Sequence, residues 1–175
     1  MVHLHETLDA EDGVGTAAAT SLTLGFAERR RSRLRASLDD GREAAVLLAR
    51  GTVLRDGDRL RDPETGLIVA VIAAAEHLSV ARTEDRHQPC RAAYHLGNRH
   101  VPVQNGADWL AYEHDHVLDA MVEALGLTVS EERRPFEPET GGYGHGHGHG
   151  HGHAAAHEHA HEGHEGQGHP HSHAT

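Results

Sequence analysis

The stretch HDHVLDAMVEALGLTV, residues 114–129, decides the fold, because it contains a complete helix, both of its ends and the start of a strand. Its apolar residues recur at helical spacing and form one stripe: Val117, Leu118, Met121, Val122 and Leu125. We expect His114 or Asp115 to cap the helix at its start. Gly126 ends it, since the residue after a helix often takes the left-handed conformation. A strand is predicted at residues 127–129.

The segments before this helix complete a recognisable order of elements. Residues 78–82 predict a strand, followed by a helix that Thr83 caps and Gly97 ends with a left-handed turn. Two strands are predicted at residues 101–104 and 109–112, separated by an Asn-Gly turn. The order βαββαβ predicts a ferredoxin-like domain over residues 78–136.

Residues 21–77 have the pattern of short strands separated by turns. Leu22 and Leu24 alternate with polar neighbours, and Asp39-Asp40-Gly41 predicts a hairpin. We expect a small β-sandwich or open barrel here. Residues 1–20 show no clear period and are expected to be a flexible amino terminus. The predicted fold class is therefore α+β, with a β-rich domain, a ferredoxin-like domain and a tail.

The tail, residues 137–175, contains twelve of the twenty histidines. It lacks the apolar surface needed to offset chain entropy, so we expect it to be disordered. Histidine and glycine alternate at its start: His145, His147, His149, His151 and His153. In an extended chain these imidazoles point to one side. A purification tag would be an uninterrupted histidine block, and a solubilising tail would favour Glu, Ser and Lys.

The chemistry predicted for the tail is binding of divalent metal ions. Neutral imidazole binds Zn(II), Cu(II) and Ni(II), and intrinsic affinity favours Cu(II) over Ni(II). The tail by itself therefore does not select a metal.

Composition excludes several classes of function. The net charge of −11 argues against a nucleic-acid groove. Cys90 is the only cysteine, so the chain has no internal disulfide, zinc ribbon or iron–sulfur cluster. A basic, apolar leader is absent, and the longest apolar run is too short to cross a bilayer, so we expect a cytoplasmic protein with no membrane partner. There is no His-Glu-x-x-His pair and no nucleophile matched to a base, so we expect no enzyme activity.

Four further histidines lie in the two predicted ordered motifs. His95 and His100 belong to YHLGNRH, residues 94–100, and His114 and His116 flank Asp115. Taken alone, each is a surface, hydrogen-bonding or capping residue. One histidine per subunit, brought together across a two-fold axis, would however give two ligands and leave coordination positions open.

Four segments together resemble the family of the urease accessory protein UreE: residues 50–58 (RGTVLRDGD), 94–102 (YHLGNRHVP), 114–119 (HDHVLD) and 135–139 (PFEPE). The resemblance implies a homodimer in which His100 from each subunit is the principal nickel ligand at the interface. It also implies peripheral metal sites at His114 and His116, and His95 matches another histidine of the motif. Glu113 stands where some members have a histidine.

The resemblance further implies the role and the partners of the protein. It predicts a nickel metallochaperone that carries Ni(II) as cargo to the urease GTPase accessory protein and so to apo-urease. Cu(II) or Zn(II) are further candidate ions. We assign the β-rich domain to partner binding. The alternative is a general His-rich protein that stores or buffers divalent metal, with the tail as its working part.

Overall fold

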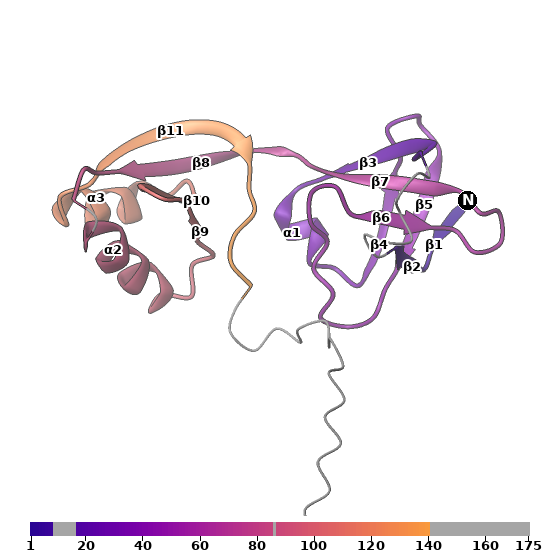
Figure 1. The fold of residues 1–175 in the computed structure, drawn as a ribbon, viewed down its shortest axis with the longest axis horizontal. Helices are drawn as coiled ribbons and strands as arrows, with labels where there is room; N and C mark the ends of the chain where they lie inside the picture. Colours follow the sequence, from indigo (N-terminus) through magenta and orange to yellow (C-terminus); the bar gives the residue numbers. More distant parts are fainter. Residues whose placement is uncertain (9–16, 86, 141–175) are drawn as a thin grey trace, which may run out of the picture. The chain divides into compact units, whose positions relative to one another are not determined.

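The carboxy-terminal half forms a four-stranded antiparallel sheet with two helices (Figure 1). The computed structural model describes residues 1–8, 17–85 and 87–140. The strands are β8 (Ala75–Arg82), β9 (Gln104–Asn105), β10 (Trp109–Glu113) and β11 (Thr128–Pro135), and the helices are α2 (His87–Gly97) and α3 (His116–Ala124). Their order in the sheet is β11-β8-β10-β9, with one helix between β8 and β9 and the other between β10 and β11. The predicted ferredoxin-like domain is confirmed.

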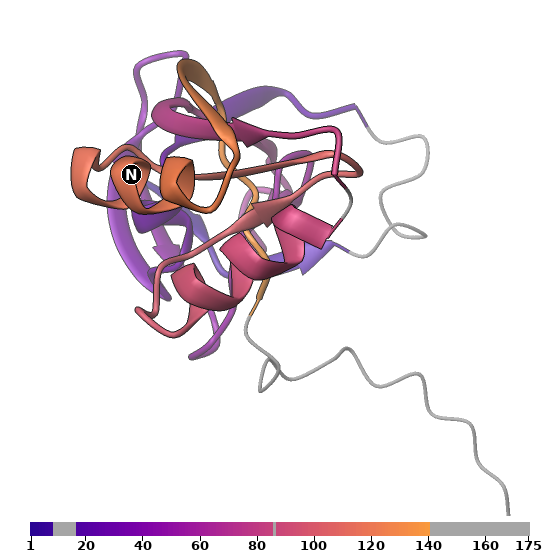
Figure 2. The same ribbon diagram turned by 90° about the vertical axis from the view of Figure 1, so that its left-hand side faces the viewer.

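Both helices pack on one face of this sheet, as the turned view shows (Figure 2). Asp115 caps α3, because its carboxylate accepts hydrogen bonds from the backbone N–H groups of Val117 and Leu118 at 2.7 and 3.2 Å. Gly126 ends the helix with φ +95°, as predicted. Val117 is 64% exposed, so the predicted apolar stripe is wrong at this position. The first turn of α3, which contains Val117, therefore lies outside the apolar core.

The amino-terminal half contains two sheets around one apolar core. The three-stranded sheet has the order β1 (Val2–Leu4), β5 (Glu43–Leu47), β4 (Arg33–Ser37). The four-stranded sheet has the order β2 (Glu6–Leu8), β6 (Arg59–Arg61), β7 (Ile68–Ala73), β3 (Thr20–Leu24). Their buried side chains form a single cluster that includes Leu4, Leu22, Val46, Leu60 and Val69. The predicted sandwich is confirmed, and Gly41, with φ +88°, makes the predicted hairpin between β4 and β5.

The expectation of a flexible amino terminus is wrong for residues 2–8. Strand β1 pairs in parallel with β5, strand β2 pairs with β6, and Leu4 is fully buried. Strands of three residues are too short to show an alternating pattern, and their stability comes from the strands beside them. Residues 9–16 lie outside the described part of the chain.

The expected start of the disordered tail at residue 137 is also too early. A short helix, α1 (Phe26–Arg29), ends in Arg29, whose side chain is fully buried. Its guanidinium donates hydrogen bonds to the backbone carbonyls of Leu24, Leu54 and Phe136 and pairs with the carboxylate of Glu137. This set of contacts fixes the chain past residue 136, because a buried guanidinium needs acceptors on every side.

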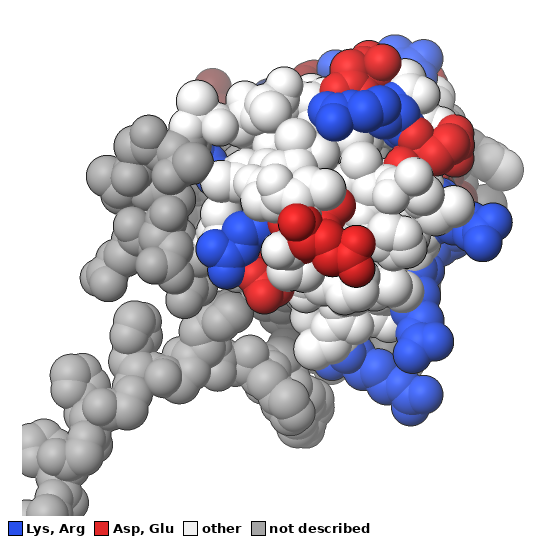
Figure 3. Space-filling view, turned by 90° about the vertical axis from the view of Figure 1, so that its right-hand side faces the viewer, with Lys and Arg blue, Asp and Glu red and all other residues white. Residues whose placement is uncertain are grey.

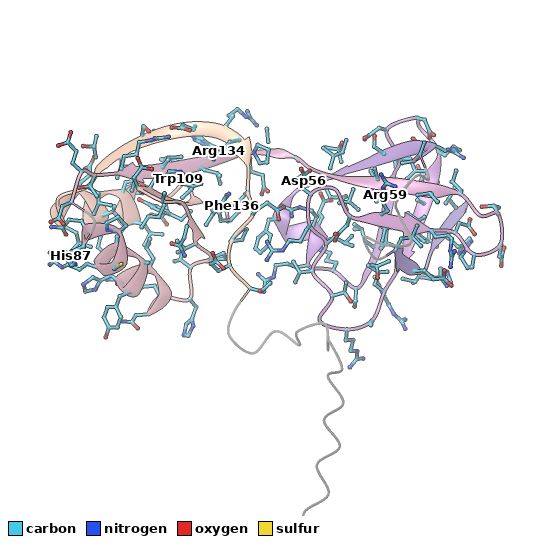
Figure 4. All side chains as sticks on the ribbon, viewed as in Figure 1. Asp56, Arg59, His87, Trp109, Arg134 and Phe136 are labelled. Atoms are coloured by element: carbon cyan, nitrogen blue, oxygen red, sulfur yellow. The ribbon has the colours of Figure 1, made fainter. Side chains whose placement is uncertain are left out.

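Aromatic contacts support the same segment. The guanidinium of Arg134 lies 4.2 Å from the ring centroid of Trp109, and both residues are labelled in Figure 4. Phe136 meets Phe26 edge to face, with ring centroids 5.5 Å apart. The end of β11 is therefore anchored on both sides of its last residue.

Candidate metal centre

The end of helix α2 places His100 on a tightly hydrogen-bonded turn. The N–H of Val101 donates to the carbonyl of Leu96 at 3.2 Å, and the N–H of His100 donates to the carbonyl of Gly97 at 2.9 Å. These two bonds define a Schellman motif in which His100 is the residue after the helix cap. Val101 and Leu96 both belong to the apolar core of this domain, which is the usual accompaniment of the motif.

The left-handed residue at this helix end is His100, with φ +58°, and not Gly97 as predicted from the sequence. Among the described residues other than glycine, it alone has a positive φ. The prediction was wrong because the helix continues through Gly97, and Gly97 serves as an acceptor within the turn. The imidazole of His100 is exposed, and it stands on a backbone that the neighbouring core residues Leu96 and Val101 hold in place.

His95 lies within α2, five residues before His100 in the chain. Its ring meets the ring of Tyr94 edge to face, with ring centroids 5.5 Å apart, and its backbone carbonyl accepts a hydrogen bond from the guanidinium of Arg99 at 3.0 Å. The side chain of Tyr94 is exposed, as is His100. The end of α2 and the turn after it therefore carry two imidazoles and an exposed aromatic ring within seven residues.

His114 lies at the end of β10, where its imidazole is hydrogen-bonded. Its Nδ1 is 3.0 Å from the hydroxyl oxygen of Ser79 and 3.3 Å from the carboxylate of Asp119. The phenol of Tyr112 donates to the same carboxylate at 2.8 Å. Burial, and then the hydrogen bond to Asp119, raises the pKa of the Tyr112 phenol well above its usual range, so the phenol remains a donor.

Two residues that sequence reasoning missed, His77 and Glu131, lie beside His114. One ligand atom from each of the three lies within 4.8 Å of the others, and no other group of three or more His, Cys, Asp or Glu is this close in residues 1–8, 17–85 and 87–140. The rings of His77 and His114 are 4.5 Å apart between centroids. His77 Nε2 is 2.9 Å from a carboxylate oxygen of Glu131.

The register of the sheet explains why these residues meet. Strands β8 and β11 are antiparallel, with Ser79 opposite Glu131, and Ser79 is opposite Tyr112 on the other side. Residues on one face of adjacent strands contact their diagonal neighbours. This pairing could not be read from the sequence, where the three residues are up to 54 positions apart.

The remaining candidate histidines are not part of this cluster. His116 is the exposed first residue of α3, whereas His95 lies on α2 and His100 in the turn that follows α2. The tail histidines His145, His147, His149, His151 and His153 lie outside the described residues. No helix in the described part of the chain has the length and apolar character needed to cross a membrane.

Comparison with known proteins gives matches over both halves of the chain. Residues 1–74 match the family described as UreE urease accessory protein, N-terminal domain, and residues 76–174 match its C-terminal domain. Over 127 residues the chain is 55% identical to a urease accessory protein UreE of Alkalilimnicola ehrlichii, covering 73% of this chain and 77% of the relative. UreE proteins of Pseudomonas putida and Cupriavidus necator are each 51% identical, covering 77% and 82% of this chain and 80% and 76% of theirs.

Proposed function

The chain belongs to the UreE family of urease accessory proteins, and from that premise we propose that it carries nickel for assembly of the urease metal centre. The observation that carries the proposal is the exposed imidazole of His100, a residue whose backbone takes the left-handed conformation just after helix α2. A non-glycine residue in this conformation costs free energy. The presence of an imidazole at a position where glycine would fit better supports a role for that side chain.

The central nickel site in this proposal is shared by two subunits. His100 from each chain supplies one imidazole across a two-fold axis, and we assign His95, five residues earlier in the chain, as an additional ligand while the ion enters or leaves. Tyr94 on α2 is 67% exposed and Val117 on α3 is 64% exposed, and we assign both side chains to the subunit contact. A site with only two fixed imidazoles leaves positions open, which suits an ion that must be released.

The tail and the β-rich domain have separate tasks in this proposal. The tail imidazoles, from His145 onward, collect Ni(II) and deliver it to the dimer site, and they also bind Cu(II) or Zn(II). The β-rich domain contacts the urease GTPase accessory protein and apo-urease in the cytoplasm. On the face in Figure 3, acidic and basic side chains lie beside an uncharged area, a surface suited to a protein partner.

A nickel titration of three variants tests the dimer site. All three lack residues 144–175, so that the tail does not contribute, and they carry His100, His100→Gly or His100→Ala. We expect both substitutions to weaken the tightest site at least about tenfold, because each removes the same ligand from both subunits. Unchanged tight binding in both variants would remove His100 from the central site.

A second experiment separates nickel delivery from general metal storage. Urease activation is measured in cells that express the full chain, the chain without residues 144–175, or the full chain with His100→Gly. A carrier with a dimer site retains partial activation without the tail and loses activation without His100. A storage protein shows the opposite pattern.

The metal affinity should also depend on pH. Protonation competes with coordination at imidazole, so nickel binding should weaken steeply as the pH is lowered from about 7.5 to about 6. Calorimetric titration at both pH values measures this, and equal affinities would argue against imidazole ligands.

A further inference from the structure

We propose that the outer face of the three-stranded sheet β1-β5-β4 binds an extended acidic segment of a partner protein, whose carboxylates pair with Arg33 and Arg35 of β4. The inference rests on the partner-binding role proposed for the β-rich domain, and it names the surface and the chemistry of the contact. It does not depend on nickel carriage or on His100.

This face of the sheet contains a hollow of about 400 Å3, whose lining includes His3, Arg33, Arg35, Ala45 and Leu47. Ala45 lies on the central strand β5, opposite His3 of β1 on one side and Arg35 of β4 on the other. Neighbouring strands are about 4.8 Å apart, so β1 and β4 form two walls about 9–10 Å apart. The small side chain of Ala45 keeps the floor between these walls low, which leaves room for one extended chain.

The guanidinium groups of Arg33 and Arg35 are exposed along one wall of this hollow. Within the part of the chain that the structure describes, neither guanidinium has a hydrogen bond or an ion pair. The carboxylate of Glu43, in the next pair on the same face, accepts a hydrogen bond from the hydroxyl of Ser37 at 3.0 Å. The hollow therefore offers two guanidinium groups whose donors are available to a ligand.

The surroundings of the hollow are basic, although the whole chain has a net charge of −11. Arg31 and Arg50 lie just beyond the open end of the hairpin formed by β4 and β5, and both are exposed. Neither has an ion pair among the described residues. A group of like charges on a protein of the opposite overall charge attracts an oppositely charged partner to one place. This group favours an acidic partner.

The spacing of the two arginines fits carboxylates two positions apart in an extended peptide. Residues i and i+2 of a strand point to the same side and are about 6.4–6.8 Å apart, in the peptide as in β4. Each guanidinium can then bind one carboxylate through two parallel hydrogen bonds. The methylene groups of these acidic side chains can rest on Leu47, which is 38% exposed. The residue between them points to the opposite wall, where the imidazole of His3 lies.

The lining favours an acidic peptide over the phosphate backbone of a nucleic acid. Among the described residues that line the hollow, none is Phe, Tyr or Trp. Proteins that bind single-stranded nucleic acid stack the bases on such rings, so a phosphate chain would find charge here but no stacking surface. Arginine on an edge strand also prevents pairing between sheets, and that role requires no ligand.

The test measures peptide binding to the full chain by fluorescence anisotropy. The probe is a fluorescein-labelled peptide, Gly-Ser-Glu-Val-Glu-Ser-Gly, and its control has Gln in place of both Glu residues. A labelled single-stranded oligothymidine is the nucleic-acid probe. The variants are the double substitution Arg33→Gln and Arg35→Gln, the uncharged change Ala45→Leu, and the matched control Arg133→Gln. Arg133 is an exposed strand residue of the other domain, with no ion pair among the described residues. Backbone amide spectra show that each variant is folded.

We expect the glutamate peptide to bind and the glutamine peptide to bind at least about tenfold more weakly. The double substitution should raise the Kd of the glutamate peptide at least about tenfold, and Arg133→Gln should leave it within about twofold. Ala45→Leu should raise it at least about threefold, because the added side chain raises the floor of the hollow without changing the charge.

Three results would overturn the proposal. The first is no binding of the glutamate peptide up to about 1 mM, which would leave protection of the edge strand as the role of the two arginines. The second is equal weakening by Arg133→Gln and by the double substitution, which would reduce the attraction to net charge. The third is tighter binding of the oligothymidine than of the peptide. Nickel titration of the double variant should match the unaltered chain, so failure of this surface is distinguishable from failure of the nickel site.

Discussion

Replacing His100 with glycine should stabilise the metal-free protein while removing the proposed nickel ligand. His100 has φ +58° and closes the Schellman motif at the end of α2. Glycine adopts this conformation without the clash between Cβ and the backbone that other residues meet. Because the imidazole is exposed, the substitution opens no cavity in the core.

The magnitude follows from two opposing terms. Relief of the left-handed conformation is worth about 1–2 kcal/mol for an L-residue. The greater freedom of glycine in the unfolded chain offsets about 0.4–1 kcal/mol of that gain. The net increase in the free energy of unfolding is therefore about 0–1.6 kcal/mol, and its midpoint of about 0.8 kcal/mol corresponds to a rise in Tm of about 2–3 °C for a protein of this size.

Scanning calorimetry in the presence of a chelator measures this change, with all samples at one protein concentration because association affects the apparent stability. The variant His100→Ala is the matched control, since it removes the imidazole and keeps a Cβ at the left-handed position. The expected order of Tm is glycine above histidine, with alanine no higher than histidine. A glycine variant less stable than the unaltered chain would refute the argument, because it would show that no backbone strain is stored at residue 100.

Three further predictions concern the contacts of Arg29, Tyr112 and Asp115. Arg29→Met should lower the free energy of unfolding by about 3 kcal/mol, because it leaves buried carbonyls and Glu137 without their donor. Urea titration measures this. The control Arg30→Ala, at the exposed residue that follows the helix, should have little effect. If His114 is a peripheral metal ligand, as the resemblance implies, Tyr112→Phe should weaken Zn(II) binding at His114 up to about tenfold, because Asp119 loses a donor that orients it beside the imidazole; 1H–15N spectra of the histidine rings measure this. Asp115→Asn should keep the helix cap and flatten the loss of stability in acid, measured as Tm against pH.

The sign of the acid prediction follows from the pKa of Asp115. Backbone hydrogen bonds from Val117 and then Leu118 lower the pKa of this carboxyl in the folded protein below its ordinary value. Its contribution to stability is therefore complete above the ordinary carboxyl pKa and is lost as the pH falls through the lowered value. Asparagine accepts the same hydrogen bonds and does not titrate, so a variant with an unchanged acid slope would show that another carboxylate is responsible.

The sequence predicted correctly those features that depend on residues close together in the chain, and it missed features that depend on residues far apart. Helix α3 was predicted well because its cap, its apolar period and its final glycine are all local, and Asp115 and Gly126 act as expected. Strands β1 and β2 were missed because three residues carry no period of their own. The left-handed residue was predicted at Gly97, whereas the structure has it at His100, since hydrogen bonds to the carbonyls of Leu96 and Gly97 decide where this helix ends.

The same difference between local and long-range interactions applies to the candidate metal ligands. His100 was singled out from the sequence only through the motif that surrounds it, while His77 and Glu131 could not be found without the register of β8 and β11. A cluster that depends on strand pairing exists only in the folded chain, so its ligands carry no shared motif. Sequence patterns therefore favour sites built from neighbouring residues or repeats, such as the histidine tail, over sites assembled by a sheet.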